Sequence, residues 1–205
     1  MIRYTYINNQ ILHTYQNLKT IKFPIDPIQI ISTIPNCRYL SYQKLADISG
    51  NTVDQVIQMC DSESGCTHYD RAHDRYLILC NQSTQNHNNT GRQRWTACHE
   101  LGHILCGHFE ISETIKLSEN NFALSQYPEF ESEADYFAAM TLAPFPLFKL
   151  LNIKSPIDIQ NTFGLSTEAS VYRFQSYLKW KNTRLKTAWE NDMIRLYKQS
   201  LNDCQ

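Results

Sequence analysis

Apolar side chains recur at helical spacing in several separate stretches of the chain. The clearest set occupies positions i, i+3, i+4 and i+7 and so shares one helix face: Val53, Val56, Ile57 and Cys60. Thr52, directly before this set, is a residue type that caps helix N-termini. The pattern therefore predicts a helix that begins after Thr52.

The same periodicity, together with capping residues, predicts further helices along the chain. Ser41 caps one that Gly50 ends, and Ser155 and Ser166 cap two near the C-terminus. The predicted helices cover residues 11–18, a short stretch from Pro27, and residues 42–49, 92–109, 128–144, 156–164, 167–178 and 187–201. Helices therefore dominate the C-terminal half.

Short runs rich in strand-forming residues stand before the long helix at 92–109. Residues 66–70 and 75–81 read as two strands around a turn at 71–74, and residues 37–40 read as another strand. A polar, Asn-rich loop follows at 82–91. We expect an α+β fold with a small antiparallel or mixed sheet.

Composition and charge narrow the class of protein. The chain has 205 residues, 42% of them hydrophobic, and a formal net charge of -1, so it lacks the basic excess of a nucleic-acid-binding domain. The most apolar stretch, 136–148, contains two prolines and is too short for a bilayer, which needs about 20 residues. We expect no membrane association.

The cysteines and the N-terminal residues indicate the cellular compartment in which we expect the protein. The seven cysteines are odd in number and include no Cys-x-x-Cys pair, and the first residues lack the charged start and apolar run of a signal peptide. We expect reduced, mostly buried thiols in a soluble cytoplasmic protein. A thiol redox sensor is the less favoured alternative.

The strongest chemical signal is His99-Glu100-Leu101-Gly102-His103 within the predicted helix. Residues four apart lie on one helix face, so both imidazoles can bind one ion. Zinc accepts imidazole nitrogen and leaves a position for water at catalytic sites. Glu100 is then the predicted catalytic base that takes a proton from the attacking water.

A third metal ligand is expected from the next strong helix. Glu131 and Asp135 are four residues apart there and share a face, so Glu131 can coordinate while Asp135 accepts the outward N–H of a ligand histidine. Glu133 points about 200° away from Glu131 around a helix of 3.6 residues per turn. We therefore prefer Glu131 as the ligand and expect Glu133 on a solvent or interface face.

Several segments together resemble the ImmA/IrrE family of metallopeptidases. They are residues 94–103, 131–139 and 142–144, with weaker similarity at 76–81 and 163–174, so that the resemblance covers residues 22–178. Trp95 and Cys98 stand where the family usually has Phe and Ala, and Asp135 stands where Asn is common. Asp also occurs at this place in related gluzincin-type enzymes.

The resemblance implies a zincin-like domain with an active-site helix over residues 1–150. A helical, helix-turn-helix-like segment over residues 151–205 is packed on or appended to it. It further implies a cytoplasmic endopeptidase with one zinc ion, often carried by phages or mobile elements, that cleaves a transcriptional repressor. The strand near residues 76–81 would pair with an extended substrate by strand addition.

Two other functions stay open at this point. One is a regulator that keeps the zinc-binding fold with little peptidase activity. The other is a helix-turn-helix DNA-binding protein, whose second helix begins Thr167-Glu168-Ala169-Ser170 and is poor in base-contacting residues. The basic run Lys179, Lys181, Arg184 and Lys186 reads as a solvated face.

The remaining polar residues receive less specific interpretations. His108 would lie about 140° off the metal face of a continuous helix, so we expect a surface or capping histidine. The electrophile that stabilises the oxyanion is left open among five residues: Tyr136, Tyr172, His68, His73 and Arg94.

Overall fold

The computed structural model describes residues 1–82, 90–118, 127–182 and 187–202. Most of the polar loop predicted at 82–91 lies outside these residues, as do Arg184, Lys186 and Cys204. The six described cysteines are all free and buried, as expected. Among the helices of these ranges, none is both long and apolar enough to cross a membrane.

The sheet is small and mixed, as predicted, and has four strands within the described residues, one more than the sequence indicated. β1 (Cys37–Ser41) runs parallel to β3 (Arg75–Cys80), which pairs antiparallel with β2 (Gly65–Asp70). β2 pairs in turn with the short β4 (Lys116–Leu117), so the order is β1-β3-β2-β4. The expectation that a substrate adds to the strand near 76–81 is wrong, because β1 and β2 already occupy both edges of β3.

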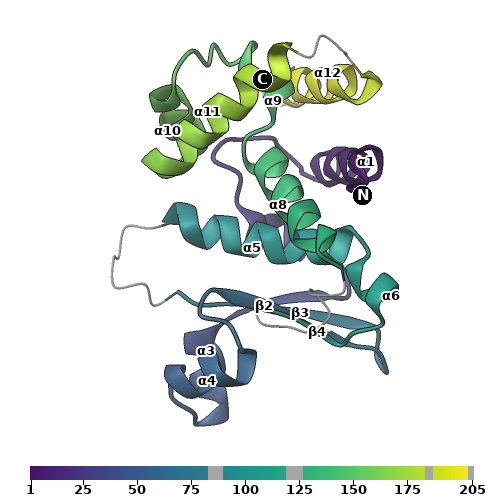
Figure 1. Cartoon of the computed structure of the whole chain (residues 1–205), viewed down its shortest axis with the longest axis vertical. Helices are drawn as coiled ribbons and strands as arrows, with labels where there is room; N and C mark the ends of the chain where they lie inside the picture. Colours follow the sequence, from purple (N-terminus) through teal and green to yellow (C-terminus); the bar gives the residue numbers. More distant parts are fainter. Residues whose placement is uncertain (83–89, 119–126, 183–186, 203–205) are drawn as a thin grey trace.

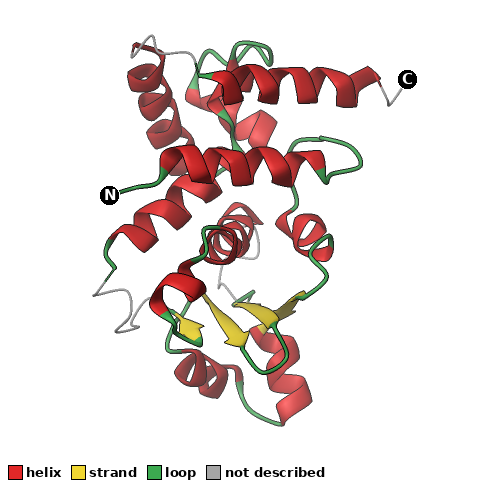
Figure 2. Cartoon of the chain, turned by 90° about the vertical axis from the view of Figure 1, so that its right-hand side faces the viewer, coloured by secondary structure: helices red, strands yellow, loops and turns green. Residues whose placement is uncertain are grey.

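Helices cover both faces of this sheet. α5 (Thr90–Leu105) lies across one face, and α3 (Tyr42–Ser49) and α4 (Val53–Cys60) pack together on the other (Figure 1). α8 (Glu129–Leu142) lies on the far side of α5 from the sheet, with α1 (Tyr4–Gln16) beside it (Figure 2). The helix pair α5 and α8 therefore forms the centre of the molecule.

The other helices are short or belong to the C-terminal part. They are α2 (Pro27–Ser32), α6 (His108–Ser112), α9 (Phe145–Phe148), α10 (Pro156–Phe163), α11 (Thr167–Asn182) and α12 (Ala188–Asn202). α10 and α11 pack on each other, while α12 contacts α1 and α9. The α+β fold with a helical C-terminal segment is confirmed.

Local capping explains why several of these helices begin where the sequence predicts. The Thr52 hydroxyl accepts from the backbone N–H of Gln55, whose side chain accepts from the backbone N–H of Thr52. Ser155 and Asp158 form the same reciprocal arrangement at the start of α10. Each cap satisfies N–H groups that the first helical turn leaves unpaired.

The long helix predicted at 92–109 ends earlier than expected. α5 stops at Leu105, and Gly107 adopts a left-handed conformation with φ 72° before α6 begins at His108. Glycine reaches this region without the steric cost that other residues meet. The chain direction therefore changes between His103 and His108, and the two no longer follow one helical spacing.

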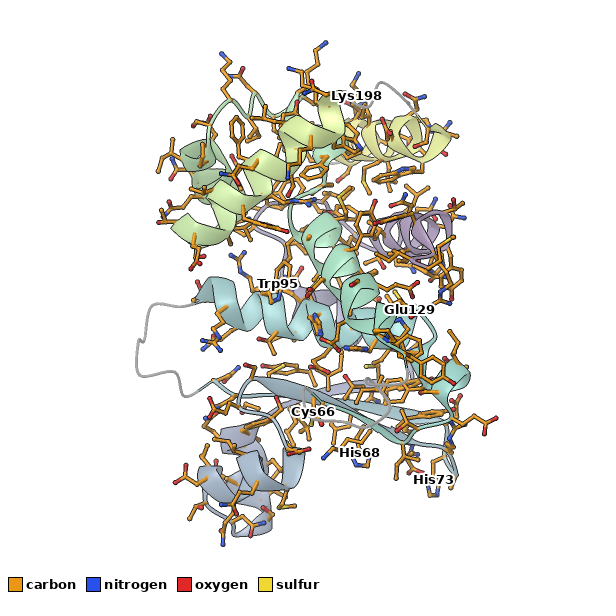
Figure 3. The ribbon with its side chains drawn as sticks, viewed as in Figure 1. Cys66, His68, His73, Trp95, Glu129 and Lys198 are labelled. Atoms are coloured by element: carbon orange, nitrogen blue, oxygen red, sulfur yellow. The ribbon has the colours of Figure 1, made fainter. Side chains whose placement is uncertain are left out.

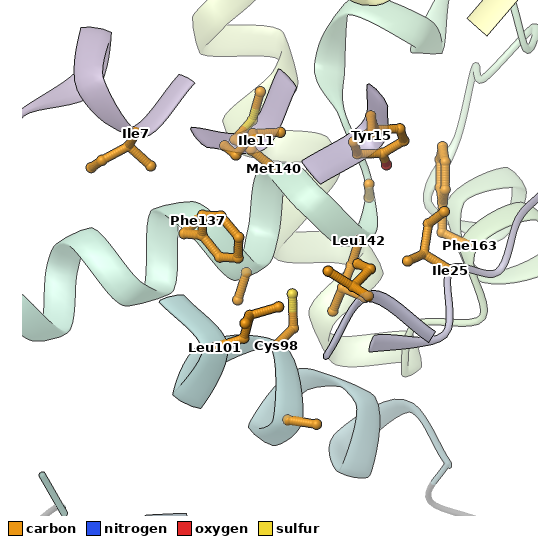
Figure 4. Packing of buried hydrophobic residues seen from close by; sticks show 14 of the residues in the cluster. Ile7, Ile11, Tyr15, Ile25, Cys98, Leu101, Phe137, Met140, Leu142 and Phe163 are labelled. Atoms are coloured by element: carbon orange, nitrogen blue, oxygen red, sulfur yellow. The ribbon is translucent and has the colours of Figure 1, made fainter. Parts of the chain in front are cut away.

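One hydrophobic core joins α1, α5, α8 and the C-terminal helices. Cys98 and Leu101 of α5 face Phe137 of α8, while Ile11 of α1 lies beside Met140 of α8 (Figure 4). The same cluster includes residues of the C-terminal helices: Ile159, Phe163, Tyr177, Met193 and Tyr197. A smaller cluster lies between α3, α4 and the sheet.

Candidate metal centre

The close approach of α5 and α8 brings the two sequence motifs together. A Cβ atom on Gly102 would meet the Cα of Ala134 at 3.1 Å and its carbonyl oxygen at 3.2 Å, closer than ordinary van der Waals contact. Glycine suits this approach because it has no side chain, whereas any Cβ here would require the backbone of α8 to shift by a few tenths of an ångström. The absent side chain places His99 and His103 beside the first turn of α8.

Three groups converge where the helices meet. The Nε2 atoms of His99 and His103 are 3.1 Å apart, and the Glu131 carboxylate lies 3.3 Å from each of them. Glu133, on the same helix, does not take part and contacts His108 instead. The ligand set predicted from the sequence is thus the set that the structure brings together.

The outward nitrogens of both histidines are also engaged. His99 Nδ1 lies 3.0 Å from the Asp135 carboxylate, as anticipated for that carboxylate. His103 Nδ1 lies 2.9 Å from Nδ1 of His108. If both Nδ1 atoms carry the proton, both Nε2 atoms present a lone pair towards Glu131.

The electrostatics of this cluster favour a positive charge at its centre. Burial opposes charge on His99, but Asp135 and Glu131 outweigh it and raise the pKa of this imidazole to about 10. Burial also raises the pKa of Glu131, yet hydrogen bonds from His103 and His99 hold it well below its ordinary value. Burial lowers the pKa of His103 despite the hydrogen bond to Glu131.

A divalent ion fits this donor set. Ligand atoms about 2.0–2.2 Å from a tetrahedral zinc ion lie about 3.3–3.5 Å from one another. The observed separations of 3.1–3.3 Å are close to this spacing. With the protons of both histidines on Nδ1, the two Nε2 lone pairs and the Glu131 carboxylate would repel one another, and a cation among them would relieve this repulsion. Two imidazoles and one carboxylate are also the ligand set of many catalytic zinc sites.

Glu100 lies next to the three ligands, and a residue of the sheet holds its side chain in place. Its side chain is buried, and the hydroxyl of Thr67 on β2 donates to its Oε2 at 2.7 Å. Thr67 itself is fully buried, so this contact fixes the direction of the carboxylate. Glu100 thereby stays near the position where a water molecule would meet the ion.

A cleft of about 350 Å³ opens over these groups. Its walls include all of the predicted site residues together with others that were not predicted as site residues: Ser64, Arg92, Trp95, Thr96 and Ser118. Trp95 lies on α5 (Figure 3). The Ser118 hydroxyl is buried and has no hydrogen-bond partner within the described part of the chain.

The five residues considered for oxyanion stabilisation are absent from the described lining of this cleft. Tyr136 donates its hydroxyl proton to Asn8, and Arg94 donates to the carbonyl oxygen of Gly164. Tyr172 is exposed on α11. His68 and His73 lie on the sheet and its turn, away from α5 (Figure 3).

The structure corrects the expectation for His108 and chooses the interface over the solvent face expected for Glu133. His108 is not a surface or capping histidine, because its side chain is fully buried and stacks on Phe130 at 4.0 Å between ring centroids. Glu133 does not face solvent, because it is also fully buried and pairs with Arg3. Helix α1, which begins after Arg3, covers the side of α8 that the sequence pattern left open.

Arg3, Glu133 and His108 form a connected group behind the ligands. Arg3 donates to the Glu133 carboxylate through its backbone N–H at 2.8 Å and through its guanidinium. His108 Nε2 lies 3.1 Å from the same carboxylate. Burial, with the nearby charge of His103, lowers the pKa of His108 to about 3, so its imidazole is neutral at pH 7.

This group also includes Cys106, whose Sγ lies within 4.8 Å of ligand atoms of His108 and Glu133. It is a poor metal site, since the Arg3 guanidinium already neutralises Glu133 and both His108 nitrogens are bonded. Burial further raises the pKa of the Cys106 thiol to about 12. His99, His103 and Glu131 are therefore the better-suited cluster.

Comparison with known proteins places the chain in a peptidase family. The family model described as the IrrE N-terminal-like domain, a peptidase family, matches residues 53–175, which is more than half of the chain. The match contains α5, α8 and every residue of the cleft, whereas Arg3 and the whole of α1–α3 lie before it. No curated protein matches the chain.

Proposed function

The chain belongs to the IrrE N-terminal-like peptidase family and is a metallopeptidase, and from this premise we propose that it is a zinc-dependent endopeptidase that cleaves a regulatory protein. The observation that carries the proposal is the convergence of His99 Nε2, His103 Nε2 and the Glu131 carboxylate within 3.3 Å. Such a cluster suits a divalent cation, and an open cleft beside it can admit a peptide.

In the proposed reaction, His99, His103 and Glu131 hold the ion. When bound, zinc supplies Lewis acidity that polarises the peptide carbonyl and lowers the pKa of a water. Glu100 takes the proton of the attacking water and returns it to the leaving amine. Thr67 keeps the Glu100 carboxylate directed at that water, and Asp135 holds the ring of His99.

The substrate we propose is a transcriptional repressor, met in the cytoplasm. The open cleft supports an extended segment of a protein better than a small molecule, because its walls combine polar and apolar groups and come from different layers of the fold. Residues 1–150 would form the catalytic domain, and the helices of residues 151–205 would pack on it and help to dock the substrate.

Replacing Glu100 by Gln tests the proposed chemistry. We expect Glu100→Gln to retain one zinc ion per chain by elemental analysis and to lose hydrolysis of fluorescently labelled casein by about 100-fold or more. Glu168→Gln, at an exposed glutamate on α11, is the matched control and should keep both properties. Equal casein hydrolysis by Glu100→Gln and the control would contradict the assignment of the base.

The substrate class is tested in cells that express the chain. New protein N-termini are labelled and identified in cells with the wild type and with Glu100→Gln. We expect new termini within a DNA-binding repressor, present with the wild type and missing with the variant. An unchanged set of termini, or cuts spread evenly over unrelated proteins, would argue against a regulatory protease.

A further inference from the structure

We propose that His108 is a positioning residue for the metal centre: it accepts the Nδ1 proton of His103 and is itself held by Glu133 and Arg3. The inference rests on the proposed metal site. In this proposal His108 supports His103 through a hydrogen bond, as the Asp135 carboxylate supports His99. It also makes the N-terminal residues part of the site.

The direction of each hydrogen bond follows from the carboxylate at the end of the chain. Glu133 pairs with the guanidinium of Arg3, so it is ionised and can only accept. His108 Nε2, 3.1 Å away, must therefore carry a proton and donate it. Nδ1 of His108 faces Nδ1 of His103 at 2.9 Å, so one of these two atoms must accept; with the His108 proton on Nε2, the acceptor is Nδ1 of His108.

The tautomer of His103 follows from that of His108. Because Nδ1 of His108 accepts, Nδ1 of His103 must donate across the 2.9 Å contact. The lone pair of His103 is thereby placed on Nε2, the atom that faces Glu131 and His99. The opposite tautomer would point a proton at the metal and would set two lone pairs against each other between the rings.

His108 cannot leave this position easily. Its ring stacks on Phe130 with an interplanar angle of 4°, and its side chain is fully buried. The left-handed Gly107 aims it towards His103, and Arg3 also donates to the carbonyl oxygen of Cys106 at 2.7 Å. The contact therefore has a fixed direction, which is the property a positioning group needs.

The two ligand histidines differ in how much they depend on their partner. Asp135 beside His99 is 58% exposed, so water can replace part of its hydrogen bond. His103 is 3% exposed and His108 is fully buried, so no water reaches that contact. Without His108, the buried Nδ1–H of His103 would have no hydrogen-bond partner, and an unsatisfied buried donor destabilises the site.

Substitution of His108 separates the hydrogen bond from packing. His108→Phe keeps a ring against Phe130 and removes the acceptor, whereas His108→Asn restores an acceptor at the place of Nδ1. His68→Phe is the matched control on the opposite face of the sheet (Figure 3). We measure the zinc dissociation constant by chelator competition and the visible spectrum of the Co²⁺-loaded full chain.

We expect His108→Phe to weaken zinc binding by about 10–100-fold and to change the Co²⁺ bands, as removal of such support does in other metal sites. His108→Asn should recover most of the affinity, and His68→Phe should match the wild type. Zinc binding by His108→Phe as tight as that of the wild type would overturn the proposal. Equal weakening by Phe and Asn would also overturn it, because only packing would then matter.

A measurement on the wild type does not depend on folding of any variant. Nitrogen NMR of the zinc-loaded chain should show protons on Nδ1 of His103 and Nε2 of His108, and none on Nδ1 of His108. A proton on Nδ1 of His108 would overturn the assignment. If the tautomers agree while casein and repressors stay uncut, the proposed peptidase function fails and the positioning role stands.

Discussion

Removal of the Arg3 side chain should destabilise the whole fold, although the residue stands at the chain's N-terminus. The substitution Arg3→Met keeps the length of the side chain and deletes its charge. Glu133, which is fully buried, then loses its guanidinium partner and keeps only the backbone N–H of residue 3 and His108. The structure therefore predicts an uncompensated carboxylate in the core.

The size of this effect follows from burial. Removing one partner of a buried ion pair costs about 3–5 kcal/mol. The Arg3 side chain is 35% exposed, so solvent screening reduces this to about 2 kcal/mol. The lost hydrogen bond to the Cys106 carbonyl adds about 1 kcal/mol. A total of about 3 kcal/mol corresponds to a fall in Tm of about 6–12 °C for a chain of this size.

Thermal and urea unfolding of the metal-free protein measure this cost without a contribution from zinc. Arg195→Met is the matched control, because Arg195 is 70% exposed and pairs with Asp192 on the surface of α12. We expect the control to change stability by less than about 0.5 kcal/mol. Equal stability of the two variants would refute the reasoning, as would an Arg3→Met cost that is undiminished in a Glu133→Gln background.

Two further substitutions test how the fold supports the site. Thr67→Val removes the hydroxyl that donates to Glu100, so casein hydrolysis should fall about 10-fold or more while zinc stays bound. The control Thr167→Val, at an exposed threonine, should behave as wild type. Unchanged hydrolysis by Thr67→Val would show that Thr67 does not support Glu100. Gly102→Val forces α8 away from α5, so it should lower the free energy of unfolding by about 1–3 kcal/mol and weaken zinc binding at least about 10-fold. An unchanged zinc affinity would show that the close approach of the two helices does not position the ligands.

Local signals in the sequence account for the elements and for the cluster at the centre. Capping by Thr52 and Ser155 acts within one turn of helix, so the starts of α4 and α10 could be predicted without tertiary contacts. The His99–His103 spacing and the Glu131–Asp135 spacing are each helical, and only the meeting of their two helices lies beyond the sequence. Gly102, between the histidines, is where that meeting occurs.

The group formed by Arg3, Glu133 and His108 could not be predicted from the sequence, for two physical reasons. A helix that continued to residue 109 would put His108 off the metal face, but the left-handed Gly107 ends the helix and turns the chain. Glu133 does point away from Glu131, yet the surface it faces is covered by Arg3 and α1 from 130 residues earlier. Such a contact leaves no periodic signal along the chain.

The central claim is that His99, His103 and Glu131 bind one metal ion with a position left for water. Anomalous diffraction at the zinc edge from crystals of the zinc-loaded chain tests it most directly. We predict one peak at about 2.0–2.2 Å from Nε2 of both histidines and from the Glu131 carboxylate. A peak at Cys106 and His108 instead, or a Glu131 carboxylate that does not contact the ion, would contradict the account.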